Sequence, residues 1–454
     1  MINRAINPEK INCVSAVVDD NDSVMYHMKD CKGLNQNKSN CCDKHDSTVL
    51  TVDVARKLIV DYIDPLASTE QEYLPLQQSI DRVLAEDIIS KMNVPPYDNS
   101  AMDGFALHAD DIPLNGAAVL KIVGYSFAGH PFLEVCSRQE CICVMTGAVI
   151  PAGCNTVIPK EHVEFLDATS IKVDSSAGPK ENIRFAGEDI RLGQIVLKRG
   201  RRLTAADLGL LASLGINNVA VIRRLRVAFF STGDELQVAG EILQPGQIYD
   251  SNRYTLFGML SGLHCEITDL GVVGDDPMHV RNILQLAAMN HDVIISSGGV
   301  SVGEADYVHQ VLNELGDIVF WKVAIKPGRP LIFGSLQQTL FFGLPGNPVA
   351  VMVSFCQFVQ PALQRFGGEI FRPHLMLRAV TSSHLNKKAG RTEYQRGILS
   401  QAADGELTVC STGEQGSGIL LSMSQANCFI VLNANQTRVE AGSTVIVQPF
   451  DNWF

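Results

Sequence analysis

The sequence predicts a multidomain α/β protein: a three-layer α/β/α domain with a mostly parallel sheet, an inserted small β domain, a helical linking domain and a C-terminal β domain. Its 454 residues exceed what one ordinary hydrophobic core accommodates. From residue 225 to about 365, short apolar runs alternate with helical patterns, which requires a largely parallel sheet with helices on both faces. Short β-like runs separated by Gly, Pro and Asn fill 119–180 and 374–454 instead. The predicted parts are a polar, disordered extension (1–48), a discontinuous linking domain (49–91 with 188–224), an inserted β domain (92–187), the α/β domain (225–370) and a C-terminal β domain (371–454).

The composition is that of a globular protein, with 46% hydrophobic and 19% charged residues. A formal charge of -12 argues against a general nucleic-acid binder, which needs a basic face. The 12 cysteines form no Cys-x-x-Cys pair and no signal-peptide pattern is present, so we expect reduced thiols and a cytoplasmic protein. No apolar run approaches the ~20 residues of a membrane span, so no membrane association is expected.

Helical patterns flank the first group of β-like runs. An apolar stripe from Val52 to Ile63 predicts one helix, and apolar residues from Leu76 to Leu84 predict a second. A further helix is predicted over 203–214, with Thr204 as its N-cap and Gly215 just after its end. Because the β-like runs lie between these helical segments, we expect the small β domain to be an insertion in the linking domain.

A polar loop enters the inserted domain at Pro95–Gly104. Two prolines give it an extended start, and the small and polar residues that follow have little to contribute to a core. Asp98 and Asp103 in this loop could line a cleft, or could hold a turn through Asx hydrogen bonds. Thr146, in a second turn that contains glycine, is a similar candidate.

The stretch Asp292–Tyr307 predicts an anion site. Three consecutive apolar residues, beginning at Val293, suit a strand buried on both faces. Gly298 and Gly299 then allow a sharp turn, and Ser301 with a glutamate three residues later has the spacing of a capping box. A strand, a glycine turn and a helix N-terminus present unpaired N–H groups to an anion. Nearby carboxylates suggest a phosphate-bearing ligand with Mg2+, although the same residues would also form an ordinary turn and helix cap.

Charged side chains follow several of the predicted strands. In parallel sheets ligands bind beyond the carboxyl ends of the strands, so these turns should meet around one site. That convergence is more specific than any single motif. The acidic turns contain Asp234, Glu235, Asp250, Asp275, Asp276 and Asp306, and the basic turn contains Lys326 and Arg329.

Seven segments in order resemble the MoeA family, the molybdopterin molybdenumtransferases, which is similar to the E domain of gephyrin. The likeness runs from about Thr51 to the C-terminus and leaves out the extension. Its segments are Pro95–Gly104, Met145–Gly147, Gly187–Ile190, Ser231–Glu235, Ser296–Asp306, Ile325–Gly328 and Gly343–Pro348.

The resemblance implies a four-domain homodimer whose α/β domain binds molybdopterin. It implies that adenylylated molybdopterin and molybdate are the substrates, that the phosphoanhydride is cleaved with release of AMP, and that Mg2+ is required. The family often has lysine where this chain has Arg329, which exchanges a point donor for a planar fork. The implied residues are Asp234, Glu235, Asp306 and Asp103 for catalysis; Asp234, Asp275 and Asp306 for the metal; Lys322, Lys326 and Arg329 for molybdate and phosphates; and Thr146, Asp189, Ser296, Ser297, Gly298, Gly299, Ser301, Pro345, Asn347 and Pro348 for other ligand contacts.

Two alternatives and several partners follow from the same resemblance. The preceding step, adenylylation of molybdopterin with ATP, would need only the α/β domain, whereas this chain also carries the Pro95–Gly104 loop and two β domains. A non-catalytic scaffold, the role of part of gephyrin, is the other alternative. Molybdopterin adenylyltransferase and later cofactor-modifying enzymes are the expected partners, and Asp103, Thr146 and Asp189 are expected to come from the other subunit.

Overall fold

A computed structural model describes residues 14–15, 27–28, 49–67, 70–175, 178–300 and 307–450. The chain forms two compact units, Met1–Ser47 and Thr48–Phe454. In the first, only a pair of short antiparallel strands is described, β1 (Val14–Ser15) and β2 (His27–Met28), so the predicted disorder of 1–48 lies outside the described residues. The fold described below is that of the second unit.

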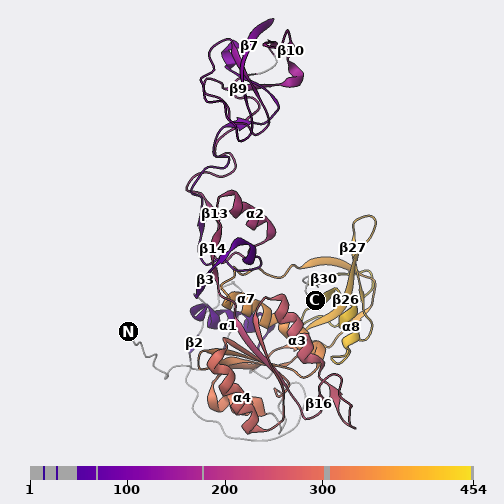
Figure 1. Ribbon diagram of the computed structural model, residues 1–454. Coiled ribbons are helices and arrows are strands. Elements are labelled where there is room, and N and C mark those ends of the chain that lie inside the picture. Colours follow the sequence, from indigo (N-terminus) through magenta and orange to yellow (C-terminus); the bar gives the residue numbers. More distant parts are fainter. Residues whose placement is uncertain are drawn as a thin grey trace. The chain divides into compact units, whose positions relative to one another are not determined.

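The central element is a sheet that lies between helices (Figure 1). Its strand order is β18-β15-β19-β23-β22-β20. The first four strands run parallel to one another, and β22 and β20 are antiparallel to their neighbours. The expectation of a mostly parallel sheet is therefore confirmed. Its strands are β15 (Arg226–Thr232), β18 (Glu266–Val273), β19 (Val293–Ser297), β20 (Asp317–Lys322), β22 (Pro330–Leu336) and β23 (Thr339–Leu344).

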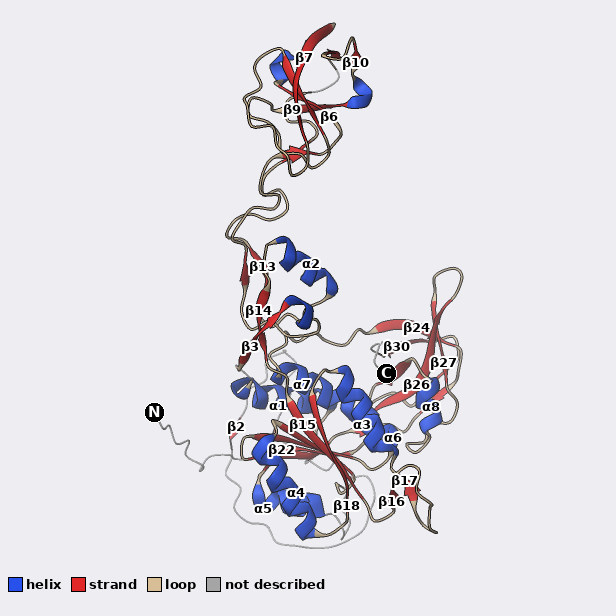
Figure 2. Cartoon of the chain, in the orientation of Figure 1, coloured by secondary structure: helices blue, strands red, loops and turns tan. Residues whose placement is uncertain are grey.

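Helices cover both faces of this sheet (Figure 2). Side chains alternate along β15, so Val227 and Phe229 join one hydrophobic core while Ala228 and Phe230 join the other. The first core also takes side chains from α1, α3, α6 and α7, and the second takes them from α4 and α5. The helices are α1 (Val52–Ile63), α3 (Ser251–Gly262), α4 (Pro277–Asn290), α5 (Tyr307–Leu315), α6 (Pro348–Ser354) and α7 (Gln360–Phe366), with a π-helical turn η5 (Phe355–Val359) between the last two.

The linking segments contain more strand than the sequence suggested. The helix α2 (Ala205–Ser213) has the expected cap, because the Thr204 hydroxyl accepts from the Asp207 N–H in a capping box. The prediction of a second helix over Leu76–Leu84 is wrong. Only Leu76–Gln78 forms a short 3₁₀ turn, and Asp81 has a φ of 59°, a value that does not occur in an α-helix. Val83 and Leu84 then form β-bridges, and they enter different hydrophobic clusters, as alternating strand residues do. Two short strand pairs complete these segments: β3 (Gln71–Pro75) with β14 (Asn218–Ile222), and β4 (Ile88–Ile89) with β13 (Ile195–Leu197).

Two further sheets have the β character that the sequence predicted. The sheet of order β10-β11-β7-β8-β6-β9 lies within residues 104–174. The short strands β5 and β12, which precede and follow this range in the sequence, pair with each other. Near the C-terminus β26, β27, β24, β30 and β28 pair in a closed ring, because β28 also pairs with β26. The strands are β5 (Asn99–Ser100), β6 (Gly104–Leu107), β7 (Ala117–Ser126), β8 (Glu140–Val144), β9 (Thr156–Pro159), β10 (Glu164–Phe165), β11 (Ser170–Asp174), β12 (Ile183–Arg184), β24 (Leu377–Thr381), β26 (Thr392–Gln401), β27 (Leu407–Ser411), β28 (Cys428–Leu432) and β30 (Thr444–Pro449).

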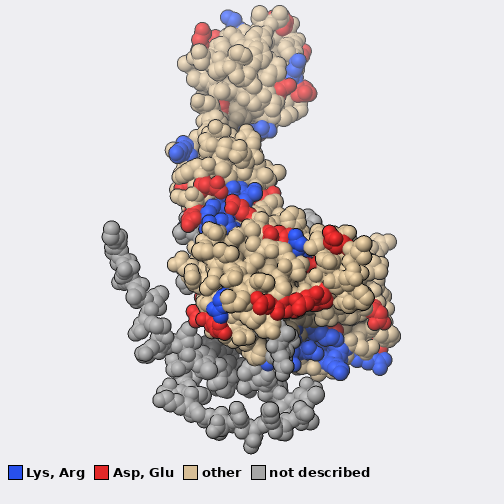
Figure 3. Space-filling model, turned by 60° about the horizontal axis from the view of Figure 1, so that its bottom comes forward, with Lys and Arg blue, Asp and Glu red and all other residues tan. Residues whose placement is uncertain are grey.

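The surface carries charges of both signs. On the face shown in Figure 3, basic side chains form separate groups beside acidic ones instead of one continuous basic surface. In the part of the chain that the structure describes, no helix combines the length and the apolar character needed to cross a membrane. The cysteines in the described part of the second unit are free thiols.

An ion pair at the start of β19 should make stability depend on acid pH. Two Arg223 nitrogens lie 2.6 and 2.9 Å from the Asp292 carboxylate oxygens, and the Arg226 backbone N–H also donates to that carboxylate. Burial alone would raise the pKa of Asp292, but these hydrogen bonds outweigh it and hold the pKa below its usual value. The stabilisation is therefore fully present above the unfolded-state pKa of about 4 and is lost as pH falls through the lower folded-state pKa.

We expect Asp292→Asn to reduce the free energy of unfolding at pH 7 by about 1–3 kcal/mol. The difference from the unsubstituted chain should shrink as pH falls below about 4, where Asp292 becomes protonated first in the unfolded state and then in the folded state. Urea unfolding across pH measures this, with the exposed Asp317→Asn as the control. A difference that stays constant down to pH 2 would contradict the ion-pair explanation.

Candidate functional site

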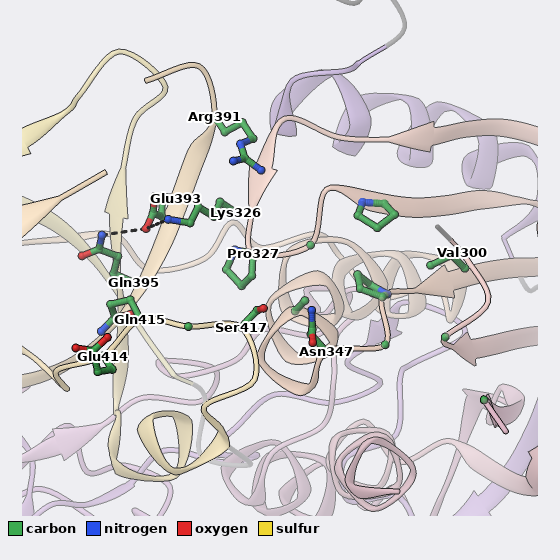
Figure 4. Close-up of a pocket in the computed structure, with 18 of the residues that line it drawn as sticks. Val300, Lys326, Pro327, Asn347, Arg391, Glu393, Gln395, Glu414, Gln415 and Ser417 are labelled. Carbon is green, nitrogen blue, oxygen red and sulfur yellow. Dashed lines mark hydrogen bonds and ion pairs between the residues drawn. The ribbon is translucent and has the colours of Figure 1, made fainter. Parts of the chain in front are cut away.

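A cavity of about 1050 Å³ opens where the strands of the α/β sheet end. One wall comes from the turns after β15, β18, β19 and β23, and the other comes from the C-terminal β domain. Figure 4 shows Lys326 and Pro327 between the two sets of side chains. The lining residues are Thr232, Gly233, Glu235, Asp275, Gly298, Gly299, Val300, Lys326, Pro327, Gly328, Pro330, Pro345, Gly346, Asn347 and Ala350, together with His384, Asn386, Arg391, Glu393, Gln395, Ser411 and Gly413 to Ser417.

The glycine turn after β19 needs both of its glycines. Gly298 and Gly299 have φ values of 92° and 64°, in the left-handed region that favours glycine. A Cβ on Gly298 would lie 2.4 Å from the Thr232 carbonyl oxygen, and one on Gly299 would lie 2.6 Å from a Val308 methyl group. The turn therefore brings bare backbone to the cavity wall, as an anion site requires.

Three acidic residues, Asp234, Glu235 and Asp275, form an acidic corner beside this turn. The Thr232 hydroxyl donates to Asp275 Oδ1 at 2.6 Å, and the Asp275 N–H donates to Asp234 Oδ1 at 3.1 Å. Glu235 and Asp275 line the cavity, while Asp234 is exposed and acts on the corner through this hydrogen bond. Among the residues described, no group of three or more His, Cys, Asp and Glu side chains is arranged to hold a metal on its own. Mg2+ commonly needs only one or two protein carboxylates when substrate phosphates supply other oxygens, and this corner fits that pattern.

Lys326 supplies positive charge at the junction of the two walls. Its Nζ lies 3.0 Å from Glu393 Oε1, and the same oxygen accepts from Gln395 Nε2 at 3.0 Å (Figure 4). The Glu393 side chain is 3% exposed whereas that of Lys326 is 41% exposed. The buried Glu393 carboxylate therefore anchors the Lys326 ammonium group in the wall of the cavity. Arg391 adds a second cation to the lining.

A buried arginine shapes the opposite loop. Arg396 is 1% exposed, and its guanidinium donates to the carbonyl oxygens of Glu414, Gln415 and Gly416 at 2.9–3.1 Å and to the Ser422 hydroxyl. Burial lowers the pKa of Arg396 to about 10, so the group remains charged at neutral pH. The loop it holds includes the glycine-rich turn at 415–418, of which Gln415, Gly416 and Ser417 line the cavity.

The structure brings many predicted residues together but not all of them. Glu235, Asp275, Gly298, Gly299, Lys326, Pro345 and Asn347 line the cavity, and Asp234 contacts that lining. Ser296 and Ser297 are buried beneath the glycine turn, Pro348 begins α6, Arg329 is exposed, and Lys322 lies 4.0 Å above the Trp321 ring centroid. Ser301 and Asp306 lie outside the described residues, as does the predicted capping box.

Asp103, Thr146 and Asp189 are exposed and are not among the cavity's described lining residues. The backbone N–H and the hydroxyl of Thr146 both donate to Asp103 Oδ1 at 2.8 Å. The backbone N–H bond from Thr146, followed by its hydroxyl bond, lowers the pKa of Asp103 and keeps it ionised. The pair thus presents a fixed carboxylate on the inserted β domain.

The sequence did not single out the residues that the C-terminal β domain contributes from positions 384–395. Glu393 and Gln395 join the site through β26, whose first residues pair with β21 (Ile325–Lys326). His384, Asn386 and Arg391 line the cavity from the segment that precedes β26. The alternation of Glu393 and Gln395 was the available signal, because it places two polar side chains on one face of a strand. Nothing local to those residues shows which other segment they meet.

Comparisons with known proteins cover most of the chain. Three family models match in order: "MoeA N-terminal region (domain I and II)" at residues 50–215, "Probable molybdopterin binding domain" at 228–365 and "MoeA C-terminal region (domain IV)" at 378–450. A molybdopterin molybdenumtransferase of Haemophilus influenzae is 43% identical over 407 residues, which are 89% of this chain and 99% of the relative. Gephyrin of Dictyostelium discoideum is 32% identical over 88% of this chain and 62% of its own length. A crystal structure of the molybdopterin biosynthesis MoeA protein from Pyrococcus horikoshii superposes with a TM-score of 0.77 at 29% identity, covering 88% of this chain and all of the other.

Proposed function

Because the chain belongs to the MoeA family of molybdopterin molybdenumtransferases, which insert molybdenum during molybdenum cofactor biosynthesis, we propose that the cavity takes adenylylated molybdopterin and molybdate and releases AMP. One observation carries the proposal. A backbone anion turn, an acidic corner and an anchored lysine line the same cavity, although they come from segments far apart in the sequence.

The anhydride of the adenylylated pterin belongs at the glycine turn. A pyrophosphate needs N–H donors and a counter-ion, and Gly298 and Gly299 lie beside the carboxylates of Glu235 and Asp275. Mg2+ held by Glu235 and Asp275 would neutralise the phosphate charge, and Asp234 would keep Asp275 in place. Asp306 is a further candidate ligand from the sequence.

Molybdate is a tetrahedral dianion, so it requires cations and hydrogen-bond donors. Lys326 and Arg391 both line the cavity near the junction of its walls. Glu393 fixes the position of the lysine, and so the charge need not be ordered again when the anion binds. We assign molybdate to these two cations, with Lys322 and Arg329 as outer contributors to the positive field.

The partner subunit would complete the site. Asp103 and Thr146 form a preorganised polar pair on the inserted domain, and the cavity in this chain contains neither of them. We propose that this pair and Asp189 reach the cavity of the other subunit in a homodimer. Molybdopterin adenylyltransferase would deliver the substrate in the cytoplasm and later cofactor-modifying enzymes would take the product.

One experiment separates this function from the preceding step. The purified protein is incubated either with adenylylated molybdopterin, molybdate and Mg2+, or with molybdopterin, ATP and Mg2+, and the products are identified by mass spectrometry. We expect AMP and molybdenum-loaded pterin in the first mixture and no adenylated pterin in the second. The reverse result would assign the chain to adenylylation, and no turnover in either mixture would favour a scaffold.

Lys326→Ala should raise the molybdate concentration needed for half-maximal insertion. Loss of one charged hydrogen bond, worth about 1.5–3 kcal/mol, corresponds to a rise of roughly 10- to 100-fold. The maximal rate at saturating molybdate should change less. Molybdate titrations measure both values, with the exposed Lys198→Ala as the matched control and Lys326→Arg to retain the charge. An unchanged molybdate requirement in Lys326→Ala, with the protein folded, would refute the assignment.

A further inference from the structure

One buried amide joins the two glycine turns of the cavity. Asn252 lies in the first turn of α3, is 7% exposed, and sits beside Asp250, whose carboxylate caps that helix by accepting from the Arg253 N–H. Asn252 Nδ2 donates to Ser297 Oγ at 2.8 Å and to the Gly346 carbonyl oxygen at 2.6 Å. Both hydrogens of the amide group therefore have acceptors: one is the last residue of β19, just before the turn at Gly298, and the other lies in the loop after β23.

The two loops separate just where Asn252 holds them. The β19–β23 ladder ends at the pair Ser297 and Leu344, and beyond it the Gly298 N–H makes one more bond to the Leu344 carbonyl. A Cβ on Gly346 would lie 3.9 Å from the Gly298 Cα, so the two glycine turns lie against each other. Gly298 and Gly346 both line the cavity.

The direction of the amide is fixed by its acceptors. If the amide were flipped, Oδ1 would face the Gly346 carbonyl oxygen, and two acceptors would oppose each other. In the orientation observed, Oδ1 is buried and has no hydrogen-bond partner among the described residues. An unpaired buried oxygen costs stability. The two hydrogen bonds that Asn252 donates therefore explain its presence better than any stabilisation of α3 does.

We propose that Asn252 is a positioning residue for the transfer reaction, which sets the spacing of the two glycine turns without touching the substrate. The inference rests on the function proposed above. Without the amide, Ser297 Oγ and the Gly346 oxygen lose their shared donor, and the turn that binds the anhydride can move relative to the loop after β23. A misplacement of about 1 Å at a reacting group can cost on the order of 100-fold in rate.

Asn252→Ala should lower kcat for AMP release about 10- to 100-fold. The molybdate concentration for half-maximal rate should stay within about twofold, because Lys326 lies on a separate strand pair. A purely structural residue would lower the melting temperature without this split between the two parameters. The exposed Asn313→Ala on α5 is the matched control for loss of an asparagine from a helix and should leave both parameters unchanged.

A double-mutant cycle tests the route of action. If Asn252 acts through Ser297, then Asn252→Ala combined with Ser297→Ala should lose little more activity than Asn252→Ala alone, and additive losses would overturn the proposal.

Hydrogen exchange supplies a readout that does not need turnover: Asn252→Ala should speed exchange in peptides covering 293–300 and 340–347 of the ligand-free protein. Unchanged exchange there would also overturn it. If the unsubstituted protein released no AMP but the exchange changed, the proposed function would fail while the positioning contact would stand.

Discussion

Replacing Asp275 with asparagine should reduce AMP release by about 100-fold or more, one of the largest effects expected for a single side chain in this site. Asparagine keeps the shape and can still accept from the Thr232 hydroxyl, so the acidic corner should keep its hydrogen bond. What it removes is the negative charge that would hold Mg2+ against the anhydride. The fall in rate should be accompanied by a higher Mg2+ concentration for half-maximal activity, which a metal titration of AMP release measures.

The adjacent residue provides a matched control for this substitution. Asp276 is also a carboxylate, but its Oδ2 accepts from the His279 N–H as the N-cap of α4, a role that asparagine fills almost equally well. Asp276→Asn removes the same charge one residue away and should leave the Mg2+ requirement nearly unchanged. Equal losses in both variants would indicate a general field effect.

Asp234→Ala should likewise leave a folded protein that does not release AMP, because the Asp275 backbone loses its acceptor.

The α/β half of the site could be predicted because its signals are local. Gly298 and Gly299 follow the apolar strand β19, Asp234 and Glu235 follow β15, and Asp275 follows β18. Parallel strands with the same pattern must end at one edge of the sheet, so their turns meet whatever the connecting loops do. Positive φ and close backbone approach in a two-glycine turn also follow from the sequence alone.

The C-terminal wall could not be predicted, because it depends on pairing between distant residues. Lys326 and Glu393 are 67 positions apart, and their contact exists because β21 pairs with β26. Arginine is mostly exposed in proteins, yet Arg396 is buried and donates hydrogen bonds to carbonyl oxygens of a loop, which nothing local in the sequence indicates. The failed helix at Leu76–Leu84 has a related cause. Apolar residues spaced by three and four positions also suit a bent strand that contacts two clusters, and only the partners decide between them.

Gly298→Ala should impair both folding and activity, because a single methyl group has no space at this position. The added Cβ would lie 2.4 Å from the Thr232 carbonyl oxygen, and an L-residue would also have to adopt a φ of 92°. Positive φ in an alanine and displacement of backbone together should lower the free energy of unfolding by about 2–4 kcal/mol. The displaced element would be β15 at Thr232, which also supplies the hydroxyl to Asp275, so AMP release should fall by about 100-fold even in the folded fraction.

The contrast with a second glycine makes this result specific. Gly258 lies inside α3, where an added Cβ meets nothing within 4 Å, so Gly258→Ala should stabilise the protein by about 0.5–1 kcal/mol through higher helix propensity. Urea unfolding should therefore show that Gly298→Ala lowers the free energy of unfolding and that Gly258→Ala raises it. The rate of AMP release should differ by about two orders of magnitude between the two variants. An active, stable Gly298→Ala protein would mean that the turn can accept a side chain. The cavity would then have no fixed backbone site for a phosphate, and the carboxylates and Lys326 would have to bind some other ligand.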